Sequence, residues 1–179
     1  MTDNRDPETF AELRNDEDVR VRWSVAQNRS TPKEVLAGLA DDMDEYVRRH
    51  VAGNPATPEE VFAKLAKDKS VGVRLRVAGN SSTPAYVLAR LTNDENPVVR
   101  ASAAGNSSTP LDVLTKLAKD KNMDVRERVA RNPSTPKEIS AKIVQKKERR
   151  DRLRQVRTLA YMLMVLTALF IVYVSFGME

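Results

Sequence analysis

A 26-residue motif recurs five times along the chain without insertion or deletion. The five copies are VRWSVAQNRSTP (21–32), VRRHVAGNPATP (47–58), VRLRVAGNSSTP (73–84), VRASAAGNSSTP (99–110) and VRERVARNPSTP (125–136). Each copy begins with Val-Arg, has asparagine at its eighth position and ends in Thr-Pro. Self-similarity at such a period is the signature of a solenoid, in which each unit buries its apolar side against the next unit.

Each Thr-Pro pair predicts the start of a helix. Threonine is a good N-cap residue, and proline suits the first helical position because its missing N–H would have no partner there. Behind the pair, apolar residues fall at i, i+1, i+4 and i+5, as in Val35, Leu36, Leu39 and Ala40, which predicts one buried stripe. In four copies an acid such as Glu34 would complete a capping box at the third helical position.

A second, shorter helix is predicted over the first half of each motif, with apolar residues such as Val47, Val51 and Ala52. We expect this helix to end at Gly53, Gly79 and Gly105, each followed by asparagine, in a left-handed turn that these residue types tolerate. The period-2 alternation of strands is absent. The predicted fold class is therefore all-α.

The register also extends beyond the five copies. Phe10 and Leu13 align with Leu36 and Leu39, so residues 7–15 are predicted to form a lone helix before the first copy, and Ile139 and Ile143 continue the pattern after the last. The expected organisation is a disordered N-terminus (1–6), a helical solenoid (7–145), a basic juxtamembrane helix or linker (146–157), a transmembrane helix (158–176) and a short tail (177–179). No secretory signal is expected before the repeats.

The units V-R-x-x-V-A-x-N-x-S-T-P-x-x-V-L-x-x-L-A-x-D resemble the leucine-rich repeat variant family over about residues 7–145. The resemblance implies a right-handed solenoid of alternating α and 3₁₀ helices, and a generic interaction role rather than a reaction. One member of that family carries an N-terminal cysteine-rich iron-sulfur module. This chain contains no cysteine, so that cofactor is not expected here, nor is a disulfide framework or a thiolate zinc site.

The formal net charge of +5 is not spread along the chain. Residues 1–141 contain 22 Lys+Arg and 22 Asp+Glu, whereas residues 142–157 contain 8 basic and 2 acidic residues. The excess therefore lies beside the C-terminal apolar run, and it indicates membrane orientation rather than an anionic ligand of the repeats.

The C-terminal run, residues 159–176, has 16 apolar residues out of 18 and no charge. As a helix it would extend about 27 Å, close to the ~30 Å of a bilayer's hydrocarbon core. A buried core helix is the alternative, but a solenoid offers no central cavity for one. We predict a single crossing, with the repeats on the cytoplasmic side of a bacterial inner membrane because the positive flank precedes it.

The basic flank either sets topology alone or sets topology and also contacts anionic lipid headgroups; both interpretations stay open. Its residues are Lys146, Lys147, Arg149, Arg150, Arg152, Arg154 and Arg157.

Catalytic groups are sparse. His50, the only histidine, occupies a position filled by other residue types in the remaining copies, which favours an exposed or rim site over a ligand. No phosphate-binding loop, metal-ligand spacing or nucleophile elbow is present in the sequence. We expect neither an enzyme nor a bound cofactor or metal.

Three features are candidates for ligand or partner binding or for structure. The arginine ladder would align five guanidinium groups, which either bind carboxylates and phosphates or pair with the aspartates that recur at the same period; the second alternative is favoured. The asparagine ladder is expected to satisfy backbone groups in turns. Trp23 is either packed or a recognition aromatic. The arginines are Arg22, Arg48, Arg74, Arg100 and Arg126; the asparagines are Asn28, Asn54, Asn80, Asn106 and Asn132; the aspartates are Asp16, Asp42, Asp68, Asp94 and Asp120.

These expectations combine into a membrane-tethered scaffold that binds a protein partner. The alternative is a nucleic-acid or other polyanion binder that uses the arginine ladder.

Overall fold

In the computed structural model, residues 7–176 are described, and every regular element among them is an α-helix. The expected disordered N-terminus (1–6) and tail (177–179) lie outside the described residues. The helices are α1 (Pro7–Leu13), α2 (Val19–Gln27), α3 (Lys33–Leu39), α4 (Glu45–Gly53), α5 (Glu59–Leu65), α6 (Val71–Gly79), α7 (Ala85–Leu91), α8 (Pro97–Gly105), α9 (Leu111–Leu117), α10 (Met123–Arg131) and α11 (Lys137–Phe176). The predicted all-α solenoid with a long apolar C-terminal helix is confirmed.

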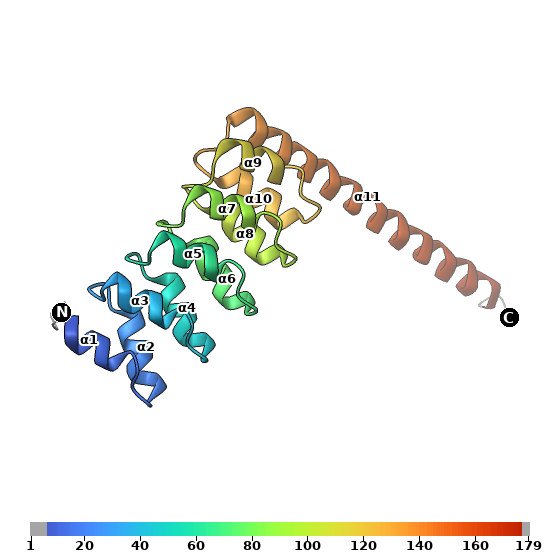
Figure 1. Cartoon of the computed structure of the whole chain (residues 1–179). Coiled ribbons are helices and arrows are strands. Elements are labelled where there is room, and N and C mark those ends of the chain that lie inside the picture. The colour runs from blue at the N-terminus through green and yellow to red at the C-terminus, as the bar shows by residue number, and fades with distance from the viewer. Residues whose placement is uncertain (1–6, 177–179) are drawn as a thin grey trace. The chain divides into compact units, whose positions relative to one another are not determined.

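Residues up to Ser140 form one compact unit, and residues from Ala141 form a second. In the first unit the helices alternate between 7 and 9 residues. Each 9-residue helix from α2 to α8 contacts the next 9-residue helix, and each 7-residue helix packs against the 9-residue helix that follows it (Figure 1). The motif thus builds two rows of helices, which is the quasi-one-dimensional stacking of a solenoid.

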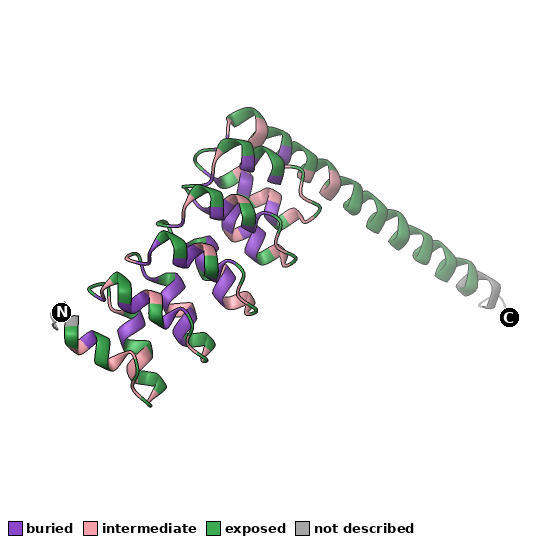
Figure 2. Cartoon of the chain, viewed as in Figure 1, coloured by how far each residue is buried: buried purple, intermediate pink, exposed green. Residues whose placement is uncertain are grey.

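The core of this unit is a line of small and medium apolar side chains between the two rows, and Figure 2 shows the buried positions recurring in each repeat. Val47, Val51 and Ala52 on α4 are fully buried, as are their equivalents on α6. Leu36, Phe62, Leu88 and Leu114 supply the large side chains from the other row. Burying each such side chain contributes about 1.5–3 kcal/mol, so stability accumulates repeat by repeat.

Four details of the predicted repeat are wrong. The helix that follows Thr-Pro has 7 residues and the helix that contains Val-Arg has 9, so the predicted order of lengths is reversed. Both are α-helices, where the resemblance implied alternation with 3₁₀ helix. The other two concern how the helices begin and end.

Threonine does not cap the 7-residue helices. Proline occupies the N-cap itself, with extended ψ, and the carbonyl of Pro32 accepts from Val35 and Leu36. The buried Thr31 hydroxyl instead donates to the carbonyl of Val25 at 2.6 Å, and the other four copies repeat this contact. The hydroxyl serves the preceding helix because that helix has unpaired carbonyls at its end. As a consequence, Glu34 lies one position earlier than a capping box requires.

The predicted left-handed turns are also absent. No residue in the described part of the chain has a positive φ, glycine included. The chain leaves α4 and α6 through Asn54 and Asn80, which have extended backbone and whose N–H groups bond to the helix. Glycine at 53 and 79 is therefore not required by backbone conformation.

The 9-residue helices have side-chain caps that the sequence analysis missed. Asp18, Asp44, Asn96 and Asn122 accept hydrogen bonds from the first turn of the helix that follows. The signal was present, because Asp, Asp, Ser, Asn and Asn recur at the same 26-residue spacing.

α11 begins in register with the 7-residue helices but runs for 40 residues. Its equivalent, α9, ends before Lys119 and Asp120, whereas Gln145 and Lys146 stand at these positions in α11. Without the aspartate that anchors the turn, the helix continues through the basic segment and the apolar run. By length and composition it can cross a membrane; no membrane is present in the structure.

Candidate binding surface of the repeat unit

The arginine ladder connects successive turns of the solenoid. Arg48 donates from Nε to Asp68 Oδ2 at 2.6 Å and from Nη2 to Asp68 Oδ1 at 3.1 Å. Its Nη1 donates to the carbonyls of Asp42 and Met43 in the turn before α4. Arg48 therefore joins the turn before α4 to the turn before α6, and four of its five N–H groups are used within the protein.

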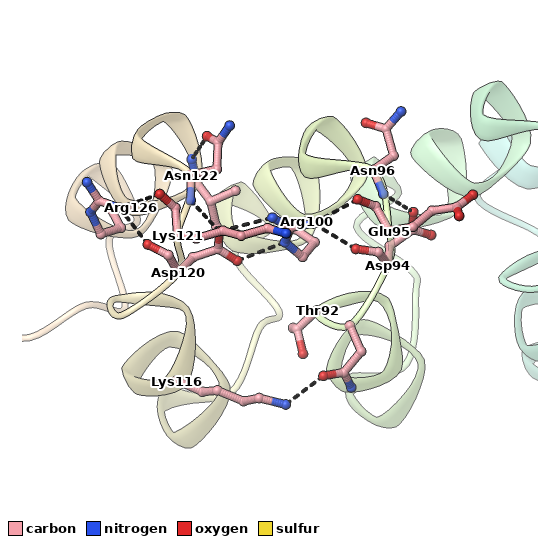
Figure 3. Close-up of polar contacts among 12 residues, drawn as sticks. Thr92, Asp94, Glu95, Asn96, Arg100, Lys116, Asp120, Lys121, Asn122 and Arg126 are labelled. Atoms are coloured by element: carbon pink, nitrogen blue, oxygen red, sulfur yellow. Dashed lines mark hydrogen bonds and ion pairs between the residues drawn. The ribbon is translucent and has the colours of Figure 1, made fainter.

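Arg22, Arg74 and Arg100 repeat this arrangement with Asp42, Asp94 and Asp120. Figure 3 shows the pair of Arg100 and Asp120. The side chains of these pairs are mostly buried. The contacts are those of the structural alternative, in which each arginine pairs with an aspartate of the same period. A polyanion at the ladder would have to displace four carboxylates.

Arg126 ends the ladder differently. Its Nη1 donates to the carbonyls of Asp120 and Lys121, and its Nη2 lies 2.9 Å from Met123 Sδ. Twenty residues further along the chain, where each other arginine finds its aspartate, stands Lys146. The last arginine of the ladder is therefore half-buried without the carboxylate of the regular pattern.

Three aspartates of the ladder, Asp42, Asp68 and Asp120, have lowered pKa values. Burial opposes ionisation of Asp42 and Asp68, but the hydrogen bonds from their arginines and from a backbone N–H outweigh it, so each pKa lies below its usual value. For Asp120 the Arg100 hydrogen bond is the largest influence, and it too lowers the pKa. Each of these carboxylates also accepts the N–H of the residue two positions on.

The asparagine ladder joins the ends of successive 9-residue helices. Asn80 Nδ2 donates to the carbonyls of Ala52 and Asn54 at 2.9 and 3.0 Å, and its Oδ1 accepts from Ser82 N–H. Asn54, Asn106 and Asn132 repeat the three contacts. These buried amides satisfy helix-terminal carbonyls, so their role is structural, as predicted from the sequence.

Three other arginines are not used in this way. Arg29, Arg49 and Arg76 make no hydrogen bond or ion pair with any residue that the structure describes. They line one hollow of about 440 Å³, together with Gln27, His50 and Gly53. We call this the basic hollow.

The basic hollow continues along the stack. Arg29, Arg49, Gly53 and Arg76 also border a second hollow of about 480 Å³ that reaches Gly79 and Ser102. No Asp or Glu of the described part of the chain lines either one. Three guanidinium groups thus share a carboxylate-free surface, although the charges of residues 1–141 balance in total.

An apolar hollow of about 250 Å³ adjoins the basic one. It is lined by Val19, Trp23, Tyr46 and His50, with the polar residues Arg20 and Asp44 beside them. The Trp23 and His50 rings lie 5.2 Å apart, and Trp23 is 41% exposed. Trp23 is therefore partly packed and partly open, and His50 belongs to both hollows.

Burial, and then the charges of Arg76 and Arg49, lower the pKa of His50. The lowered pKa favours the neutral imidazole, which packs against Trp23 between the two hollows. No group of three or more His, Asp or Glu side chains that could hold a metal occurs among residues 7–176.

The sequence pattern pointed to Trp23 and the ladder but not to Arg29, Arg49 and Arg76. Their signal lay in the positions that differ between copies. Where Arg49 stands, the other copies have Trp, Leu, Ala and Glu, and where Arg76 stands they have Ser, His, Ser and Arg. In this chain the invariant positions hold the stack together, and the variable positions are the ones that differ in what lines the surface.

The comparisons agree with the fold. A scan against models of known protein families found no match, and no curated protein matches the chain. Among solved structures, the chain is similar to one described as a leucine-rich repeat variant with a novel repetitive structural motif, with 30% identity and a TM-score of 0.59. The match covers 74% of this chain and 53% of the other, so this chain spans about half of that protein's length. The leucine-rich repeat variant fold predicted from the motif is therefore supported.

Proposed function

We propose that this chain is a membrane-tethered scaffold that holds a leucine-rich repeat variant solenoid at the cytoplasmic face of a membrane, the bacterial inner membrane, and binds a protein partner there. Solenoids present extended surfaces to macromolecules. Anchoring one raises its concentration near membrane-bound targets. The role requires no catalytic group.

One observation carries the tether. Every side chain from Leu159 to Val172 on α11 is exposed, and all but one of these residues are apolar. An apolar surface of this size is costly in water, and soluble proteins rarely expose one. A helix apolar on every side suits lipid, where all its backbone groups are already paired.

The basic segment supports the orientation. Seven Lys and Arg residues lie between 146 and 157, before the apolar run. Positively charged flanks stay on the cytoplasmic side, and these side chains would also meet anionic headgroups at about 1 kcal/mol each.

The tether is tested by cell fractionation. The full chain should remain in the membrane pellet after alkaline carbonate extraction, and the double variant Leu163→Arg/Leu166→Arg should move to the supernatant, because two charges at the middle of a span each cost about 2.5–3.5 kcal/mol. The matched control Val98→Arg/Leu111→Arg places the same charges at exposed apolar positions of the repeats and should stay in the pellet. A wild-type chain that extracts into the supernatant contradicts the tether.

Orientation is tested separately by protease protection. In spheroplasts, protease added outside should leave the repeat unit intact, and lysis should expose it. Cleavage of the repeats in unlysed spheroplasts would contradict the cytoplasmic placement.

A further inference from the structure

Some arginines of this solenoid pair with aspartates, whereas three others lie together at a surface that has no carboxylate. Four guanidinium groups form ion pairs with aspartates, those of Arg22, Arg48, Arg74 and Arg100. Arg29, Arg49 and Arg76 have no such partner among the described residues and border one continuous depression. Guanidinium groups gathered without a counter-ion repel one another, and an incoming carboxylate relieves that repulsion while forming charge-assisted hydrogen bonds.

The apolar hollow supplies a second contact of different chemistry. Trp23 and Tyr46 offer aromatic surface there, and His50 connects this surface directly to the basic hollow. Aromatic residues and arginines are the side chains that dominate protein–protein binding energy. The basic hollow and the apolar hollow together have the size of a few side chains of a bound segment.

We propose that the basic hollow (Arg29, Arg49, Arg76) and the adjoining apolar hollow (Trp23, Tyr46) together bind an acidic segment of a partner protein, with a large apolar side chain of that segment against Trp23 and its carboxylates on the arginines. This inference rests on the proposed scaffold function and names the site and chemistry of the partner.

The surface favours a protein segment over a nucleic acid because the carboxylate-free basic surface extends along only a few repeats. In the fourth copy the positions of Arg49 and Arg76 are taken by the uncharged Ala101 and Ser102, and in the fifth Glu127 stands beside Arg128. A phosphate backbone would need a basic track along many repeats. A short acidic segment needs only the three arginines and one apolar contact.

Gly53 is a position where a substitution can test the proposal. It lies in the basic hollow with negative φ, and a Cβ built on it would meet only Arg76 Cδ, at 3.9 Å. The variant Gly53→Glu therefore fits and places a carboxylate of the chain itself beside Arg76. Gly105 is the equivalent residue two copies later, where a Cβ would meet Arg128 Cδ at 3.7 Å, so Gly105→Glu makes the same change outside the two hollows that Arg29 and Arg49 line.

The probe is a synthetic peptide with a leucine pair followed by a run of glutamates, titrated into the full chain in neutral detergent. Trp23 is the only tryptophan, so its fluorescence reports binding at the apolar hollow. The wild type and Gly105→Glu should bind alike, and Gly53→Glu should weaken binding by roughly tenfold or more, the value of a single charge-assisted hydrogen bond.

A second set of variants tests the arginines themselves. Arg29→Gln/Arg49→Gln/Arg76→Gln should lose the peptide, whereas Lys33→Gln/Lys67→Gln/Lys119→Gln, with the same charge change at exposed lysines, should retain it. The peptide with glutamine in place of every glutamate should not bind the wild type. Circular dichroism of each variant checks that the helices are intact.

Three results would overturn the proposal. They are no binding of the acidic peptide to wild type, equal binding by both glycine variants, and tighter binding of a single-stranded oligonucleotide than of the peptide. Failure of this site is distinguishable from failure of the scaffold function. If wild type and the triple arginine variant capture the same specific partner from membrane extracts, the scaffold stands and the site is wrong; if neither captures one, the scaffold function itself fails.

Discussion

Arg48 and Asp68 face each other through two parallel hydrogen bonds of 2.6 and 3.1 Å, from Nε and Nη2 to the two carboxylate oxygens. Both side chains are 8% exposed. The same guanidinium group reaches back to the turn that precedes its own helix. One side chain thus fixes the spacing of two successive turns.

Removing one partner of this pair should be costly. We expect Arg48→Met to lower the free energy of unfolding by about 3–5 kcal/mol, because Asp68 would remain as a buried, uncompensated charge. The double variant Arg48→Met/Asp68→Leu should lose less than the sum of the two single variants. Urea denaturation followed by circular dichroism measures all three. Additive losses would mean that the pair does not interact across the turns.

Acid should weaken the solenoid through the same carboxylates. The pKa values of Asp42, Asp68 and Asp120 are lowered by folding, so their contribution is fully present above the ordinary aspartate pKa of 3.8 and is lost as pH falls below it through the folded values. Thermal unfolding between neutral pH and pH ~3 should show the decline beginning near pH ~4. Asp68→Asn should flatten that decline; an unchanged slope would contradict the assignment.

The asparagine ladder makes a prediction about buried backbone. Asn80→Ala leaves the carbonyls of Ala52 and Asn54 without their donor and should cost about 2–3 kcal/mol. Asn93→Ala is the matched control, since Asn93 is exposed and accepts only from Lys116 at the surface. Its effect should stay within about 0.5 kcal/mol in the same denaturation experiment.

His50 reports the charge of the basic hollow. Its pKa should lie below the ordinary 6.5, because of burial and the charges of Arg76 and Arg49. Since the folded value is lowered, this group stabilises the fold above pH ~6.5 and loses that contribution as pH falls through the folded pKa. As the only histidine, it can be titrated by NMR without assignment.

The variant Arg49→Gln/Arg76→Gln should raise the His50 pKa toward 6.5, and the acidic peptide should raise it in the wild type. Lys67→Gln, outside the hollow, should leave it unchanged. A titration curve indifferent to both arginines would show that burial alone sets the value.

The basic segment should govern attraction to anionic membranes. Arg149, Arg154 and Arg157 are exposed on α11. Replacing all three with glutamine should reduce binding of the detergent-free chain to vesicles rich in phosphatidylserine by about 3 kcal/mol, at about 1 kcal/mol per charge, and leave binding to neutral vesicles unchanged. Vesicle flotation measures both. Equal loss on neutral vesicles would mean that these residues act through packing.

The sequence was sufficient for the repeat, the two-helix unit, a helix before the first copy (expected over 7–15, found at Pro7–Leu13) and the pairing of arginines with aspartates at one period. It was not sufficient for the caps. Thr31 looked like an N-cap because its hydroxyl could accept from the helix that follows, and only the packing of two successive helices decides that it donates backward to Val25 instead. Glycine before asparagine suggested a left-handed turn, yet a side-chain amide from the next repeat completes the helix end without one.

The binding surface was the hardest part to foresee. Arg49 and Arg74 both lie on 9-residue helices, and from the sequence only the invariant position was a candidate for binding, with a structural role favoured for it. The structure separates them by burial: Arg74 is 7% exposed and bonded to Asp94, while Arg49 lies at the surface of the basic hollow. The residues that recur in every copy build the stack, and the residues that vary between copies form the proposed binding surface.

The contacts between repeats also define the unit by which such a chain can change length. The Arg–Asp bonds join residues 20 positions apart, and the asparagine amides bond to carbonyls 26 or 28 positions away in the neighbouring repeat. Excising or duplicating one whole 26-residue segment re-creates the same partners at the new junction, whereas any other length misplaces all of them at once. The solenoid can thus be lengthened or shortened in discrete steps of one repeat while the contacts of the remaining repeats are kept.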